Sequence, residues 1–203
     1  MSAPSSSGSN FSMPVDRRGP GEAGRQADLL DAKLSDIPNT VAGAMRGIVE
    51  LPVAMVTVMA NGGPAMMRAA CEVAKASSTQ PWILAVTVLT SLDESDLAAT
   101  GVGGSTTDQV LRLAELALDA GCDGLICSPM EIVSLRRHFG DRPKLVVPGI
   151  RPASVDDDQK RTMTPIEALA AGADRLVIGR PITAAADPAR AARDILQGLA
   201  EAA

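Results

Sequence analysis

The stretch that decides how this sequence is interpreted is Asp31-Ala-Lys33-Leu-Ser-Asp36-Ile-Pro-Asn-Thr40, which follows the apolar pair Leu29-Leu30. If residues 28–34 form a β-strand, Asp31 and Lys33 face the same side, because side chains alternate along a strand. Asp36 then falls on the turn beyond the strand. The pattern predicts two carboxylates and an ammonium within about 10 Å at the mouth of a sheet. Taken alone, the pattern also fits a solvated strand end.

The rest of the chain repeats this strand-like character. Short apolar runs that do not alternate with polar residues occupy 28–34, 55–59, 82–89, 123–127, 144–147 and 175–178. Such runs are typical of parallel strands buried on both faces. Helical patterns separate them, including a capping box with proline at 164–167. Six strand–helix units predict a parallel sheet with right-handed crossovers, either an open doubly wound sheet or a (β/α) barrel.

The composition fits one domain with a substantial core. The chain has 203 residues, of which 46% are hydrophobic. Residues 1–27 are rich in Ser, Gly, Pro and charge, so we expect a disordered leader, followed by a single barrel domain at 28–203.

Several classes of partner are disfavoured by the same composition. Aromatic residues make up only 1% of the chain and the net charge is −5, which argues against a nucleic-acid partner. The sequence has no apolar run of about 18 residues, so we expect no membrane span. Cys71, Cys122 and Cys127 are widely spaced, which predicts reduced core thiols and a cytoplasmic location.

Function in parallel α/β folds lies at the carboxyl ends of the strands. Thr90 follows the third predicted strand, Arg151 the fifth, and Gly179-Arg180 the sixth. Two arginines and a backbone N–H at neighbouring strand ends predict a phosphate site, although each arginine alone could cap a surface loop. His138, the only histidine, lies in a helical pattern beside Arg136 and Arg137. We expect it at the surface, and we expect no metal site.

In combination, these blocks resemble the orotidine 5′-phosphate decarboxylase family. The resemblance rests on five segments in the family's order, namely Asp31–Thr40, Ala85–Ser91, Pro148–Pro152, Asp158–Arg161 and Gly179–Thr183. It runs from about Asp28 to the C-terminus. It implies a (β/α)8 barrel of the TIM type, of which about six βα units are recognisable in this chain, and a homodimer with shared active sites.

The resemblance also implies a reaction. It is the decarboxylation of orotidine 5′-monophosphate to UMP in pyrimidine synthesis, without cofactor or metal. Lys33 would protonate C6 of the pyrimidine, Asp31 would lie against the substrate carboxylate, and Asp36 would reach into the partner subunit's site. The substrate-binding residues that it implies are Ile37, Asn39, Thr40, Thr90, Arg151, Gln159, Gly179 and Arg180.

One departure from the family pattern leaves alternatives open. In the family, two βα units that carry an Asp and a second Lys normally precede the D-x-K-x-x-D strand, whereas residues 1–27 occupy that place here. One alternative is therefore a catalytically impaired remnant that binds nucleotide phosphate or acts as an interaction protein. Another is a hexulose-phosphate synthase, which uses a similar strand together with Mg²⁺.

Overall fold

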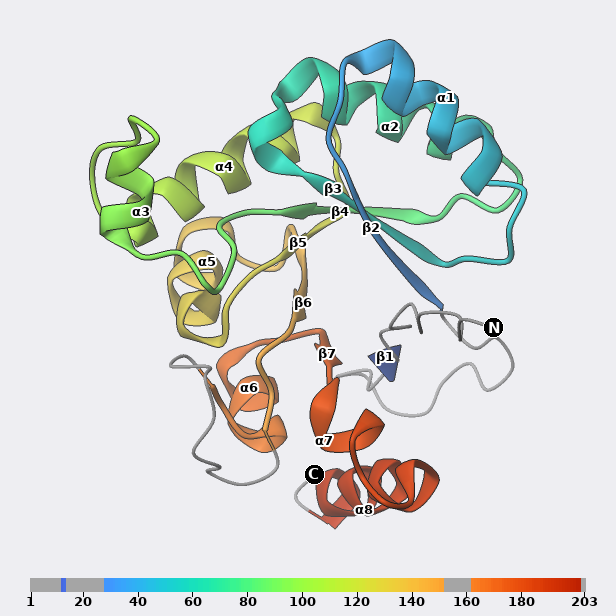
Figure 1. Cartoon of the computed structure of the whole chain (residues 1–203), viewed down its shortest axis with the longest axis vertical. Helices are drawn as coiled ribbons and strands as arrows, with labels where there is room; N and C mark the ends of the chain where they lie inside the picture. Colours follow the sequence, from blue (N-terminus) through green and yellow to red (C-terminus); the bar gives the residue numbers. More distant parts are fainter. Residues whose placement is uncertain (1–11, 14–27, 152–161, 202–203) are drawn as a thin grey trace, which may run out of the picture.

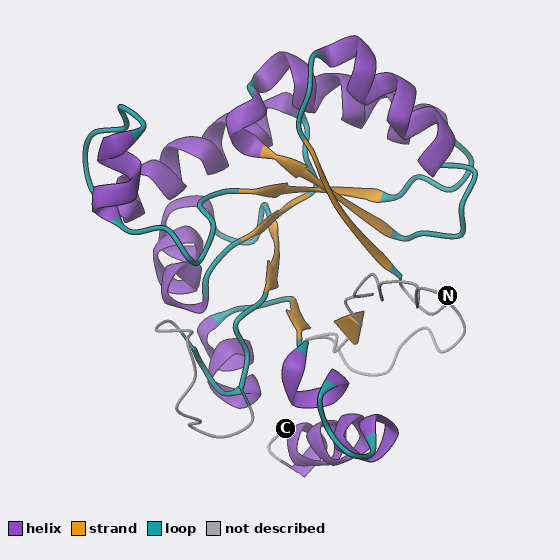
Figure 2. Cartoon of the chain, viewed as in Figure 1, coloured by secondary structure: helices purple, strands orange, loops and turns teal. Residues whose placement is uncertain are grey.

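A curled sheet of parallel strands, covered on its outer face by helices, organises the chain (Figures 1 and 2). The structure is a computed structural model that describes residues 12–13, 28–151 and 162–201. Within these residues six parallel strands follow one another in sequence order, and together they form an incomplete barrel of the TIM type. They are β2 (Leu29–Leu34), β3 (Met55–Met59), β4 (Trp82–Val86), β5 (Gly124–Ile126), β6 (Lys144–Val147) and β7 (Arg175–Val177). The predicted barrel class is confirmed, and the doubly wound alternative is not.

Some of the helices and turns begin or end at capping residues. Ser128 and Thr164 each form a capping box, and Gly121 ends a helix with a φ of 96°. The helices are α1 (Pro38–Ile48), α2 (Pro64–Ala76), α3 (Glu94–Ala99), α4 (Thr106–Ala120), α5 (Ile132–Phe139), α6 (Pro165–Ala171), α7 (Arg180–Thr183) and α8 (Pro188–Glu201), with short 3-10 turns at Ala60–Gly62 and Pro129–Glu131.

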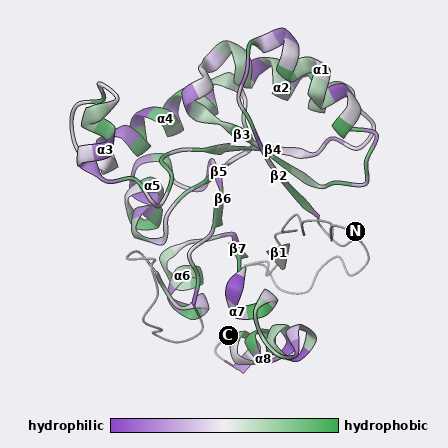
Figure 3. Ribbon diagram, viewed as in Figure 1, coloured by the Kyte–Doolittle hydropathy of each residue, from purple (hydrophilic) through white to green (hydrophobic). Residues whose placement is uncertain are grey.

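The sheet buries apolar side chains on both faces, as the non-alternating runs predict. Figure 3 shows hydrophobic residues along its central strands. A large cluster that includes Val56, Ile83 and Leu145 packs between the sheet and the helices. A smaller cluster forms around Met55, Leu84 and Val146, whose positions alternate with those of the first cluster along the same strands. This second cluster therefore fills the concave side of the sheet.

One strand was not predicted. Residues Ser12–Met13 form β1, which pairs with β7 in antiparallel orientation. Two residues are too few to show a periodic pattern, so the sequence gives no signal for them. The other residues of the predicted leader lie outside the described part of the chain, and their disorder stays a prediction. Among the described strands, β2 pairs only with β3, so the sheet does not close between β1 and β2.

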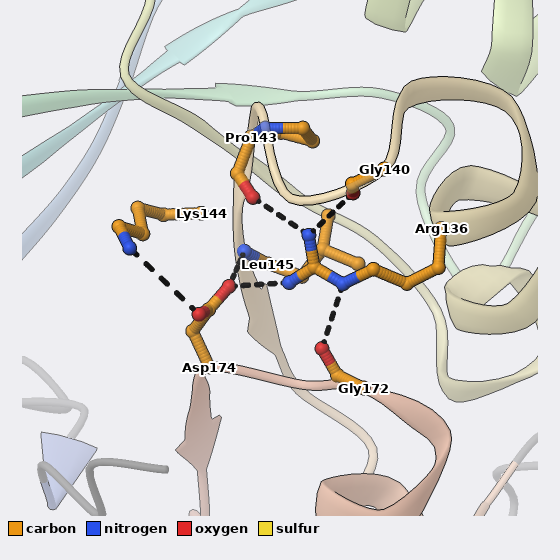
Figure 4. Close-up of polar contacts among 7 residues, drawn as sticks. All are labelled: Arg136, Gly140, Pro143, Lys144, Leu145, Gly172 and Asp174. Carbon is orange, nitrogen blue, oxygen red and sulfur yellow. Dashed lines mark hydrogen bonds and ion pairs between the residues drawn. The ribbon is translucent and has the colours of Figure 1, made fainter. Parts of the chain in front are cut away.

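A polar network joins the loops at the amino ends of β6 and β7 (Figure 4). The Arg136 guanidinium donates hydrogen bonds to the carbonyls of Gly140, Pro143 and Gly172 at 2.9 to 3.0 Å. It also forms a 2.5 Å ion pair with Asp174, whose carboxylate accepts the backbone N–H of Leu145. One side chain of α5 therefore holds both incoming connections in place.

The three cysteines lie in the core, as predicted. Cys71, Cys122 and Cys127 are free and buried, with the sulfur atoms of Cys71 and Cys122 3.8 Å apart. Burial raises the pKa of the Cys127 thiol above its ordinary value, so this thiol is protonated and poorly nucleophilic at neutral pH. A cytoplasmic location stays a prediction. Within the described residues no helix is long and apolar enough to cross a membrane.

Candidate active site

A cavity of about 310 Å³ opens at the carboxyl ends of the strands. Its floor is apolar, with Leu29, Val86, Ile126 and Val177 from four strands. Its rim is polar. Six of the residues predicted from sequence line it together, namely Asp31, Lys33, Thr90, Arg151, Gly179 and Arg180. An apolar floor with a few converging charged groups is the usual form of a site for a small polar ligand.

Asp31 and Lys33 form an ion pair at one side of this cavity. The Lys33 ammonium donates a hydrogen bond to Oδ2 of Asp31 at 2.5 Å. The Lys33 side chain is 42% exposed and that of Asp31 21%, so both remain accessible from the cavity. The Lys33 ammonium offers a positive charge and a transferable proton, and the Asp31 carboxylate offers a negative charge beside it.

The strand that carries this pair is not regular. Leu30 of β2 is opposite Val56 of β3 and Leu34 is opposite Val58, so the intervening residues of β2 bulge out of register. Lys33 adopts a φ of 46°, in the left-handed region that residues other than glycine seldom occupy. The two side chains therefore meet on a bulged strand, whereas the sequence predicted their proximity on a regular one.

A residue that sequence reasoning missed holds this bulge. The Thr57 hydroxyl accepts the backbone N–H of Lys33 at 2.8 Å and donates to Oδ1 of Asp31 at 2.9 Å. Thr57 is fully buried in β3. The available signal was a lone polar residue inside the otherwise apolar run 55–59.

Another part of the cavity rim is basic. Arg151 is 7% exposed, and its guanidinium donates to the carbonyl of Ile150 at 3.0 Å. Its backbone N–H donates to the carbonyl of Met163 at 2.9 Å, which fixes the loop after β6. Gly179 and the exposed Arg180 follow β7 on the same rim. Two guanidinium groups on one rim can bind an anionic group of a ligand whose remaining part lies over the apolar floor.

Other predicted residues lie away from this cavity. Asp36 accepts the backbone N–H of Ile37 at 2.7 Å, on an exposed turn between β2 and α1. Ile37 is 66% exposed, and Asn39 and Thr40 are exposed in the first turn of α1. Gln159 lies outside the described residues. The single chain thus brings Asp31 and Lys33 to the cavity and leaves the 36–40 segment on the surface.

The remaining ionisable groups offer no other catalytic constellation in the described part of the chain. His138 is exposed on α5, as predicted, and its ring packs edge-on against Phe139. Residues 28–151 and 162–201 contain no group of three or more His, Cys, Asp or Glu side chains placed to hold a metal ion. The charged groups that line the described cavity are the Asp31 carboxylate, the Lys33 ammonium and the guanidinium groups of Arg151 and Arg180.

Comparison with known proteins indicates the same family as the sequence motifs do. The pattern of the orotidine 5′-phosphate decarboxylase / HUMPS family matches residues 24–195. An orotidine 5′-phosphate decarboxylase of Rhodospirillum rubrum is 54% identical over 177 residues, which are 84% of this chain and 72% of that protein. The corresponding protein of Paramagnetospirillum magneticum is 56% identical over 170 residues, or 81% and 72% of the two chains.

A solved structure agrees in fold. The crystal structure of orotidine 5′-phosphate decarboxylase from Lactobacillus acidophilus has a TM-score of 0.75 and 37% sequence identity, covering 85% of this chain and 75% of its own. The region 24–195, which matches the family pattern, contains β2 to β7 and every described residue that lines the cavity. The chain therefore belongs to the orotidine 5′-phosphate decarboxylase / HUMPS family.

Proposed function

We propose that this protein decarboxylates orotidine 5′-monophosphate to UMP and CO₂ without a metal or organic cofactor. The observation that carries the proposal is the Asp31–Lys33 pair, which lines one cavity together with two arginines. The relatives from Rhodospirillum rubrum and Paramagnetospirillum magneticum, which are named for this reaction, support it. The ligand has the complementary form, with a phosphate at one end and a carboxylated ring at the other.

Lys33 is the proposed proton donor. Loss of CO₂ leaves an electron pair on C6 of the pyrimidine, and this carbanion needs both a nearby positive charge and a proton. The Lys33 ammonium supplies the charge before the proton moves and then transfers the proton to C6. Its ion pair with Asp31, at 2.5 Å, holds the ammonium in one orientation.

Asp31 is proposed to act on the substrate carboxylate. Two carboxylates about 4 Å apart repel by about 4 kcal/mol at an effective dielectric constant of 20. This repulsion disappears as CO₂ leaves, so it raises the ground state relative to the transition state and favours reaction by about a thousandfold. A thousandfold is only a small part of the rate enhancement that enzymes usually provide. Most of the reduction of the barrier must therefore come from other interactions, including the stabilisation of the carbanion by Lys33.

Arg151, Gly179 and Arg180 are proposed to bind the substrate phosphate. Arg151 is nearly buried and held by its own loop, so little conformational entropy is lost when it binds an anion. Binding energy from this remote group can offset the cost of placing the ring against Asp31. Thr90 lines the same cavity and is proposed to contact the substrate. The role of Gln159 stays a prediction.

The direct test is to add orotidine 5′-monophosphate to the purified protein, follow the loss of pyrimidine absorbance and identify UMP as product. We expect turnover that is unchanged by EDTA, and tighter binding of UMP than of uridine. A folded protein that binds UMP without turnover would instead support the binding remnant. Activity that EDTA removes and Mg²⁺ restores, on a sugar phosphate rather than the nucleotide, would support the synthase alternative.

We also propose a homodimer in which the exposed 36–40 segment completes the partner's cavity. The segment offers a carboxylate, Asp36, and an apolar side chain, Ile37, that is 66% exposed.

Two experiments test the proposed dimer. Light scattering should give twice the 20.9 kDa mass of one chain. Co-expression of Lys33→Ala chains with Asp36→Ala chains should restore part of the activity that each variant lacks alone, because mixed dimers contain one intact site. A monomer, or mixed dimers without recovered activity, would contradict the shared site.

A further inference from the structure

The conformation of the Asp31–Lys33 pair depends on a neighbouring strand. Between Leu30 and Leu34 the chain of β2 advances four residues while β3 advances only from Val56 to Val58. The ladder therefore cannot provide every backbone group of the bulge with a strand partner. Thr57 lies opposite this bulge, midway between the two β3 residues that remain in register.

The Thr57 hydroxyl replaces a backbone partner that the irregular ladder does not provide. Its oxygen accepts the N–H of Lys33 at 2.8 Å, and its proton goes to Oδ1 of Asp31 at 2.9 Å. Because a hydroxyl has a single proton, donation to Asp31 leaves its lone pairs for Lys33. The other carboxylate oxygen, Oδ2, receives the Lys33 ammonium. Three hydrogen bonds thus form a closed ring through Thr57, Asp31 and Lys33.

We infer that Thr57 is the positioning residue for the catalytic pair. It satisfies the backbone N–H of Lys33, which is held at a strained φ of 46°, and it fixes the rotation of the Asp31 carboxylate. Thr57 is fully buried and does not line the cavity, so it acts through Asp31 and Lys33 rather than on the substrate. This inference rests on the proposed decarboxylation and adds to it a residue that determines how the pair is held.

The test compares Thr57→Val with Thr57→Ser. Valine keeps the shape and removes the hydroxyl, so misplacement of the pair should lower kcat by roughly 10- to 100-fold. KM should change less than about threefold, because the hydrogen bonds that hold Arg151 at the proposed phosphate site do not involve Thr57. Serine keeps the hydroxyl and should retain kcat within about threefold of the unmodified protein. A residue needed only for folding would also lower the apparent kcat at constant KM by reducing the active fraction, so kcat is expressed per folded site, counted by calorimetric titration with UMP.

Thr87→Val is the matched control. Thr87 is also a buried threonine at this end of the sheet, but its hydroxyl donates to the carbonyl of Ile126 at 3.2 Å. We expect its kcat to stay within about twofold of the unmodified value, since none of the hydrogen bonds of the pair involves it. Should Thr57→Val fail to fold, Thr57→Ala, which removes atoms and adds none, replaces it.

The outcomes separate this inference from the proposed function. Turnover by the unmodified protein, with equal kcat in Thr57→Val, would overturn the role of Thr57 and leave the decarboxylation standing. A protein without turnover would overturn the decarboxylation instead. A crystal structure of Thr57→Val decides the position of the pair in either case. We expect a changed Lys33 backbone and a displaced Asp31 carboxylate, and an unchanged pair would overturn the inference.

Discussion

Replacement of Lys33 by alanine is expected to lower kcat for orotidine 5′-monophosphate by about 10⁴-fold or more. Loss of a general acid alone typically costs about 10²- to 10⁴-fold. Loss of a fixed charge beside a developing anion costs about 10²- to 10³-fold in comparable sites. Both effects fall on one side chain here, because the Lys33 ammonium is the only ammonium group that lines the described cavity. Absorbance-based initial rates measure the change.

Lys144→Ala is the appropriate control for this experiment. Lys144 also lies near an aspartate, with its ammonium 3.9 Å from Asp174, but it begins β6 and therefore lies at the opposite end of the sheet from the cavity. Its replacement should leave kcat within about twofold, since the charge is far from the reacting atoms and screened. Calorimetric binding of UMP should show that Lys33→Ala remains folded. A kcat for Lys33→Ala within tenfold of the unmodified value would exclude Lys33 as the proton donor.

The strands could be predicted closely because burial on both faces leaves a plain signal in sequence. The runs at 55–59 and 144–147 have the same bounds as β3 and β6. The run at 82–89 extends past the end of β4 at Val86, because Val88 is buried in the loop that follows. An apolar run reports burial and does not report whether the backbone is still hydrogen-bonded in a ladder.

The site was harder to predict in detail. Family resemblance and strand ends indicated Asp31, Lys33 and the basic rim, and all of these line one cavity. The bulge at Lys33 and the hydroxyl of Thr57 were missed because both depend on the register between β2 and β3. Register is a property of two strands, and alternation within one strand does not contain it. The role proposed for Asp36 involves a second chain, which no pattern within one chain specifies.

The second large effect concerns stability. Arg136→Met is expected to lower the free energy of unfolding by about 3 kcal/mol. The guanidinium side chain is only 13% exposed, and methionine keeps much of its apolar stem while removing every donor. The carbonyls of Gly140, Pro143 and Gly172 would lose their donor, and Asp174 would be left as a largely buried charge without its closest cation. Urea denaturation followed by circular dichroism measures the loss.

Arg142→Met separates this effect from the general cost of removing an arginine. Arg142 pairs with Asp119 at 3.2 Å, but the two side chains are 55% and 65% exposed. An exposed pair of this kind contributes about 0 to 1 kcal/mol, because water solvates both charges equally well when the pair is broken. The two variants remove the same group and the same charge, so the difference between them isolates the buried network. Equal losses in both variants would show that the connections into β6 and β7 are held by apolar packing and not by Arg136. Since β6 leads to Arg151 and β7 to Gly179 and Arg180, a large loss specific to Arg136→Met would show that this network holds the two strands that carry the basic rim.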